Sequence, residues 1–322
     1  MNTADVHIML APMEGVADFV LRDVLTRIGG YDAAVSEFVR VSGSVLPERT
    51  YERICPEIGN GSRTAAGTPV AVQLLGSDPA LLGENAARLA ALSPHGIDLN
   101  FGCPARVVNR HGGGAMLLDE PVLLNRIAAA VRRATPAHIP VTAKMRLGVS
   151  DPSRALECAR ALADGGVQAL VVHARTKAQG YRAPAHWEWV ARIRDGLAVP
   201  VVANGEVWSV GDWERCREVG GGRDVMLGRG AVSDPWLALR IRGARNPVPS
   251  CEDWLALRPF IAQYWAGVQK RAAPVHACGR LKMWLNMLRR HWGEAEGLYR
   301  AVCALGDAGE VSAVLRGHGI AC

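Results

Sequence analysis

The sequence predicts an α/β protein, a closed (β/α)8 TIM barrel followed by a C-terminal helical domain. Three observations lead to this fold class. Short apolar runs recur as far as Leu227, amphipathic stretches separate several of them, and the runs stop after Ala231. Strands that alternate with helices are typical of parallel βα units, and eight such units close into a barrel.

The apolar runs are expected to form the strands. They cover residues 8–11, 33–38, 70–75, 97–101, 141–145, 169–173, 200–203 and 225–227. Between them, residues 81–92, 121–134 and 152–165 have the length and pattern of crossover helices. The residues that follow each strand would then share one face of the barrel, where barrel enzymes keep their active sites.

Beyond the barrel, the sequence Pro-Val-Pro-Ser at 247–250 is typical of a linker. Residues 253–270, 278–292 and 294–305 predict helices. We therefore expect two domains, a barrel over residues 1–240 and a helical domain over residues 250–322.

Composition excludes several classes of protein. The 322 residues are 49% hydrophobic, which is enough to bury a large core. No leader pattern or membrane-spanning run is present, so we expect a cytoplasmic protein, and nothing indicates more than a monomer. The 8 cysteines form no C-x-x-C pair, so no metal site is expected.

The net charge of +6 permits a polyanionic partner, and its distribution is uneven. From Ile241 onward the chain has eleven basic and six acidic residues, so most of the surplus positive charge lies in the C-terminal part of the chain.

One strand ends at a cysteine. Residues 97–104 read Ile-Asp-Leu-Asn-Phe-Gly-Cys-Pro, in which Gly102 permits a turn and Pro104 prevents the strand from continuing. Cys103 is therefore expected at the mouth of the barrel, where its thiol can react. The alternative is a buried thiol that packs as a small hydrophobe.

Two glycine-containing turns follow the last two strands, Asn204-Gly205-Glu206 and Gly228-Arg229. Backbone amides and a guanidinium group can hold a phosphate, and barrels usually bind phosphate after their last two strands. The alternative is a pair of ordinary barrel turns.

In their order along the chain, the motifs at the strand ends resemble those of the tRNA-dihydrouridine synthases. The motifs are Ala11-Pro12-Met13-Glu14-Gly15, Gln73, Asn100-Phe101-Gly102-Cys103-Pro104, Gly112-Gly113-Gly114-Ala115, Lys144-Met145-Arg146, His173-Ala174-Arg175-Thr176, Asn204-Gly205-Glu206 and Gly228-Arg229-Gly230. The segment Glu37-Phe38-Val39-Arg40-Val41 most resembles the C-type subfamily, which modifies uridine 16 of the D-loop.

The resemblance implies tightly bound FMN in the barrel and NADPH as its reductant. The cofactor contacts that it implies are Ala11, Pro12, Met13, Gln73, Lys144, His173, Asn204, Gly205, Glu206, Gly228 and Arg229. Lys144 would lie near the flavin ring, where a positive charge stabilises the reduced form. A Schiff-base role is the alternative for this lysine.

The mechanism that follows is a hypothesis of two steps. Reduced flavin gives a hydride to C6 of a uracil ring, and Cys103 protonates C5 from the opposite face. A thiol with a pKa near ~8.5 is protonated at neutral pH and can release its proton. The uridine must leave its stack to reach the flavin.

The expected partner is tRNA, bound at its D-loop and elbow by the helical domain and the barrel mouth. The candidate contacts are Arg40, Asn100, Arg146, Arg175, Arg280, Lys282 and Arg290. For the basic residues after 278, a solvated helical face is the alternative.

Three other functions stay open at this point. They are an FMN-dependent barrel oxidoreductase that acts on a small pyrimidine such as dihydroorotate, a Schiff-base aldolase that uses Lys144, and an RNA-binding module without catalysis.

Overall fold

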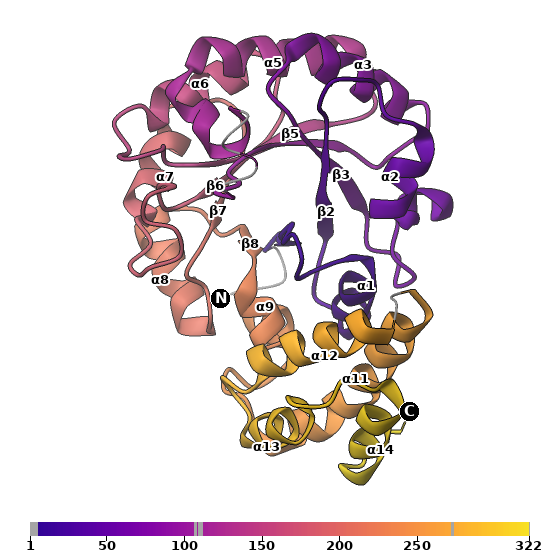
Figure 1. Ribbon diagram of the computed structural model, residues 1–322. Helices are drawn as coiled ribbons and strands as arrows, with labels where there is room; N and C mark the ends of the chain where they lie inside the picture. Colours follow the sequence, from indigo (N-terminus) through magenta and orange to yellow (C-terminus); the bar gives the residue numbers. More distant parts are fainter. Residues whose placement is uncertain (1–5, 106–107, 109–111, 272–273, 322) are drawn as a thin grey trace.

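The computed structural model describes residues 6–105, 108, 112–271 and 274–321 and confirms the predicted barrel (Figure 1). Parallel strands pair in chain order, and the last pairs with the first. The strands are β1 (Ile8–Leu10), β2 (Ala33–Arg40), β3 (Val70–Leu75), β4 (Ile97–Phe101), β5 (Val141–Arg146), β6 (Leu170–His173), β7 (Val201–Asn204) and β8 (Val225–Leu227).

Three strands, β3, β4 and β8, have the bounds that the sequence predicts. The largest difference is in β2, which continues past Phe38 to Arg40. Its register with β3 shifts between Val35 and Phe38, and pairing then resumes through Arg40 and Leu75. An irregularity of this kind re-aims the strand, and it brings Arg40 to the rim of the barrel.

Helices surround the barrel (Figure 1). They are α1 (Phe19–Ile28), α2 (Glu48–Ile54), α3 (Pro79–Ala90), α5 (Pro121–Ala134), α6 (Ala155–Asp164), α7 (Trp187–Asp195) and α8 (Val210–Gly220), with 3-10 turns η1 (Pro56–Asn60) and η2 (Gly114–Asp119). Helix α3 begins two residues earlier than expected because Asp78 caps it, accepting a hydrogen bond from the Leu81 amide at 3.0 Å.

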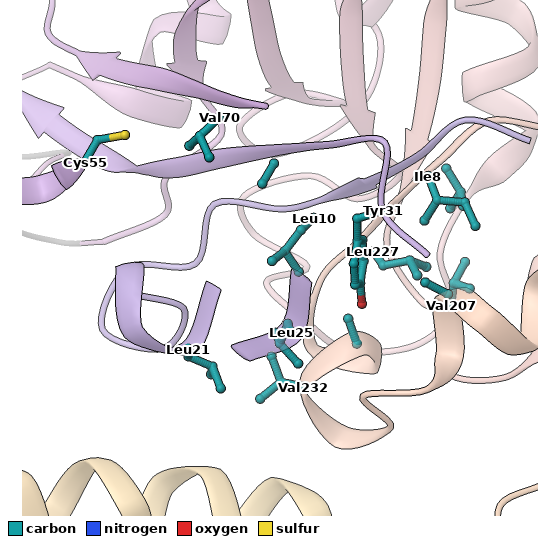
Figure 2. Packing of buried hydrophobic residues seen from close by; sticks show 14 of the residues in the cluster. Ile8, Leu10, Leu21, Leu25, Tyr31, Cys55, Val70, Val207, Leu227 and Val232 are labelled. Atoms are coloured by element: carbon teal, nitrogen blue, oxygen red, sulfur yellow. The ribbon is translucent and has the colours of Figure 1, made fainter. Parts of the chain in front are cut away.

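The core has two parts. A small apolar cluster lies inside the barrel and consists of Ala11, Val35, Val171, Val202 and Met226. A larger cluster fills the space between strands and helices. Figure 2 shows part of it, with Leu10 of β1, Leu25 of α1 and Val232 close to one another.

After β8 the chain is helical. The helices are α9 (Arg229–Ser233), α10 (Leu237–Ile241), α11 (Cys251–Arg271), α12 (Pro274–Leu288), α13 (Gly293–Val302) and α14 (Ala308–Gly317). Helices α11 to α14 gather on one side of the barrel, where α11 packs against α1 and α12 against α9 (Figure 1). Within the ranges that the structure describes, no helix is long and apolar enough to cross a membrane.

The approach of α11 to α1 requires a glycine. A Cβ atom at Gly267 would lie 2.7 Å from Cγ1 of Val20, which is closer than carbon atoms can pack. Helix α14 was not expected from the sequence, although Asp307 accepts a hydrogen bond from the Glu310 amide and caps its first turn.

A buried ion-pair network stabilises the junction of barrel and helices. Arg240 donates to Asp234 of the α9–α10 turn and to Asp253 of α11, both at 2.7 Å, and all three side chains are buried. Because Arg240 also donates to the carbonyls of Asn246 and Val248, it orders the linker as well.

We expect Arg240→Met to lower the free energy of unfolding by about 3–5 kcal/mol, because the buried Asp234 loses its ion-pair partner and the buried Asp253 keeps only its ion pair with Arg245. The control is Arg27→Met, whose ion pair with Asp23 is partly exposed, with an expected loss of about 0.5 kcal/mol. Chemical denaturation of both variants measures the difference, and equal small losses would contradict it.

Candidate active site

The strand ends open into a cavity of about 1000 Å³ at the C-terminal face of the barrel. All the barrel residues predicted for the site line it. They are Ala11, Pro12, Met13, Arg40, Gln73, Asn100, Cys103, Lys144, Arg146, His173, Arg175, Asn204, Gly205, Glu206, Gly228 and Arg229. The structure therefore brings together groups from all eight strand ends.

Cys103 lies in the loop that follows β4, with its side chain partly exposed to the cavity. Asn100 holds this loop, since its Oδ1 accepts hydrogen bonds from the amides of Gly102 at 3.0 Å and Cys103 at 2.9 Å. Burial raises the pKa of the Cys103 thiol, so the thiol keeps its proton at neutral pH. A protonated thiol at the cavity wall is what a general acid requires.

Lys144 belongs to β5 and lines the cavity. Its Nζ donates to Oδ1 of Asn204 at 2.9 Å, and Nδ2 of Asn204 donates to the Met226 carbonyl at 2.8 Å. The carbonyl fixes the orientation of the Asn204 amide, so the amide oxygen must face the lysine. Burial, together with the nearby Arg146, lowers the pKa of Lys144 to about 7.

His173 ends β6 under the turn that follows β7. Burial lowers its pKa well below the usual value, and neighbouring cations act in the same direction, so the ring is neutral. Gly205 passes over the ring with a φ of +107°, and a Cβ atom there would lie 2.7 Å from Cδ2 of His173. Glycine is required because of both the conformation and the contact.

Two arginines predicted to contact RNA are held by the protein itself. Arg146 donates to the carbonyls of Gly102, Thr176 and Gly180, and thereby braces the loop that carries the cysteine. Arg175 forms an ion pair with Glu206. Both side chains are buried, so their contacts in this structure hold the protein's own loops together.

Aromatic rings and guanidinium groups alternate at the cavity rim. Tyr181 lies between Arg146 and Arg229, with 5.2 and 4.2 Å from guanidinium carbon to ring centroid. Trp208 lies between Arg229 and Arg290, at 5.3 and 4.2 Å. The sequence did not predict a role for either ring, because the stacking joins loops after β6 and β7 to the end of α12.

The three predicted basic residues after 278 differ in their surroundings. Arg280 donates to the Gly15 carbonyl and forms an ion pair with Asp18, so it joins α12 to the loop after β1. Lys282 donates to the Leu305 carbonyl. Arg290 is exposed beside Trp208, outside the cavity wall.

Among the described residues, no group of three His, Cys, Asp or Glu side chains could hold a metal ion. The cavity is instead lined by cations and neutral amides, with Glu14 and Glu206 as its carboxylates.

Comparisons with known proteins agree with these features. A model of the dihydrouridine synthase family matches residues 9–286. The chain is 62% identical over 315 residues to the tRNA-dihydrouridine(16) synthase of Ralstonia nicotianae, which covers 98% of this chain and 96% of that protein. It is 54% identical over 314 residues to the enzyme of that name from Pseudomonas putida, with 96% of each chain covered.

A third relative, the tRNA-dihydrouridine(16) synthase of Neisseria meningitidis serogroup B, is 48% identical over 311 residues, 96% of this chain and 93% of that protein.

Two solved structures share the fold. A 2-naphthoyl-CoA reductase complex has a TM-score of 0.54 at 12% identity, with 74% of this chain and 50% of that chain covered. TcOYE with pHBA has a TM-score of 0.53 at 11% identity, with 77% and 92% covered. At these identities the likeness concerns the fold alone.

The low pKa of Lys144 predicts a pH dependence of stability. Between pH 7 and the ordinary lysine value of 10.5, the unfolded chain binds a proton that the folded protein does not. The free energy of unfolding should therefore rise with pH in this window, by at most about 1.4 kcal/mol per pH unit from this group.

Lys144→Met removes that contribution, so the stability of the native protein relative to this variant should rise above pH 7 and stay flat below it. Chemical denaturation of cofactor-free protein below and within the window measures the difference. A pH-independent difference would contradict the prediction.

Proposed function

The chain belongs to the dihydrouridine synthase family, and we propose that it forms dihydrouridine at position 16 of the tRNA D-loop, with Cys103 as the proton donor. It is an oxidoreductase that acts on tRNA, as the near-full-length relatives indicate. These relatives favour this function over the small-pyrimidine oxidoreductase, the aldolase and the inactive RNA-binding module.

FMN is the cofactor that we propose for the cavity, tightly bound and reduced by NADPH. The volume of about 1000 Å³ is at the upper end of the range for cofactor sites. Arg229 supplies positive charge, Lys144 supplies an amine whose pKa is about 7 in the free site, and the apolar Ala11 and Met13 supply a surface for a ring system. The donor set suits an anionic, aromatic group, because cations and amides outnumber carboxylates on the wall.

The residues of the last strand ends would hold the phosphate. Arg229 lines the cavity and contacts the rings of Tyr181 and Trp208, and Gly205 and Gly228 line the cavity without a side chain that would cover their backbone. Gln73 would face the pyrimidine edge of the ring system, while Lys144 and His173 would lie beside it.

When bound and reduced, FMN would supply a hydride for C6 of the uracil. The protein supplies the proton. Cys103 keeps its proton in the free site because of burial, and its Sγ would transfer it to C5 on the face away from the cofactor. Arg146 and Asn100 both hold the peptide between Gly102 and Cys103, Arg146 at its carbonyl and Asn100 at its amide, so the position of the thiol is fixed before substrate arrives.

We propose that residues 250–322 bind tRNA and that residues 1–240 bind FMN, in a monomer. Arg290 and Arg40 are the basic side chains placed best for RNA phosphates, since they lie at the rim and Arg290 is exposed. Arg280 and Lys282 contribute by holding α12 in place.

The observation that carries the proposal is a partly exposed, protonated thiol in a braced loop at the wall of a cationic cavity, in a chain 62% identical to a named tRNA-dihydrouridine(16) synthase. In cells that lack this protein, the native gene should restore dihydrouridine at position 16, and Cys103→Ala should restore less than about 1% of it, because the proton donor is lost.

Mass-spectrometric mapping of tRNA measures this outcome, with Cys251→Ala, an exposed cysteine outside the cavity, as the control that should restore it fully. Dihydrouridine restored at position 17 or 20 would refute the proposed position 16. Full restoration by Cys103→Ala would refute Cys103 as the proton donor.

Arg229→Met should weaken FMN binding about 10- to 100-fold, because a charge-assisted contact is lost. It should leave the affinity for riboflavin, which has no phosphate, unchanged. Flavin fluorescence titration measures both, and Arg290→Met on the outer side of Trp208 is the matched control that should keep FMN affinity. Equal loss of both flavins would contradict a phosphate role.

A further inference from the structure

A buried carboxylate below the cavity has no part in the steps above. Asp98 lies in the middle of β4, between the apolar Ile97 and Leu99, and is 2% exposed. Gln73 is its neighbour in register on β3, and Thr142 is its neighbour on β5. Each donates to a different carboxylate oxygen at 2.6 Å, Gln73 through Nε2 and Thr142 through its hydroxyl.

The hydrogen bonds continue from Gln73 toward the cysteine loop. Oε1 of Gln73 accepts from Nδ2 of Asn100 at 2.7 Å. Oδ1 of Asn100 accepts from the backbone amides of Gly102 and Cys103. A continuous series of hydrogen bonds therefore joins Asp98 to the loop, through two side-chain amides; we name it the amide relay.

The groups at the two ends of the amide relay favour the same orientation of the Gln73 and Asn100 side-chain amides. Both carboxyl oxygens of Asp98 accept a hydrogen bond, so Asp98 selects the NH₂ side of Gln73 and turns the Gln73 oxygen toward Asn100. The loop amides only donate, so they select the oxygen of Asn100 and turn its NH₂ group toward Gln73. If Gln73 were reversed, Asn100 would have to reverse as well, and its NH₂ group would face the two backbone N–H groups.

We propose that Asp98 is a positioning residue for the reaction: through Gln73 it fixes the orientation of the Asn100 amide, and this holds Cys103 at its working position. The inference rests on the proposed role of Cys103. Asn100 thereby has a role besides the predicted contact with the base, since its oxygen accepts two loop amides. A displacement of the thiol by about 1 Å is enough to lower kcat about 100-fold.

The test uses two mild substitutions and their combination. In Asp98→Asn, the new amide can still accept from Gln73 because its NH₂ group can donate to the Thr142 hydroxyl. In Thr142→Val, the carboxylate still accepts from Gln73. In the double variant, the NH₂ group of residue 98 has no acceptor on β5, and it turns toward Gln73 and reverses the amide relay.

We expect each single variant of the FMN-loaded enzyme to keep kcat within about 3-fold, and the double variant to lose about 100-fold with an unchanged KM for tRNA. Hydrogen exchange at the Gly102 and Cys103 amides, followed in the same proteins, should be faster by about 10-fold in the double variant alone. The Leu99 amide, inside β4, is the internal reference and should not change.

The amide relay would be overturned if the losses of kcat in the two single variants added up to the loss in the double variant. It would also be overturned if hydrogen exchange at the Gly102 and Cys103 amides were unchanged in the double variant. A large loss in Asp98→Asn alone would also overturn it, since the charge of Asp98 near Lys144 would then be what matters. Faster exchange with an unchanged kcat would overturn the positioning role. Activity in the Cys103→Ala variant would be a separate result, which refutes Cys103 as the proton donor but does not concern the amide relay.

Discussion

The pairing of β1 with β8 is the contact on which the rest of the structure depends. Leu10 lies in register with Leu227, and this parallel pair closes the sheet. In an open sheet the first and last strands would be far apart, whereas closure arranges all the strand ends around one rim. Gln73, Cys103 and Lys144 therefore share a cavity although they come from distant parts of the sequence.

Inside that rim, the polar groups have little freedom to reorient. The carbonyl of Met226 fixes the Asn204 amide and so the acceptor for Lys144, while Asn100 fixes the backbone at Cys103. Burying such groups is favourable only when each has a partner, so every fixed orientation depends on its neighbours. The site is therefore organised before any ligand binds, which reduces the cost of reaching a reactive geometry.

The sequence predicts the barrel well because eight apolar runs alternate with amphipathic stretches, and it places Cys103 at a strand end because Gly102 and Pro104 mark the turn. It does not predict the partners of Arg280, because the loop that accepts its hydrogen bonds lies far away in the chain. Asp98 carries a visible signal, a charge between apolar strand residues, but its partners depend on the register of β3 and β5.

The amide relay also has a consequence for how this sequence can change over generations. Carboxamide side chains have two discrete orientations, so the series between the carboxylate and the loop has no graded intermediate. Positions 73 and 100 are therefore expected to change together, since an exchange at one of them keeps the donor and acceptor order only when the other permits it, whereas position 98 can accept Asn while Thr142 is present. Substitutions at these two amide positions should therefore occur in pairs.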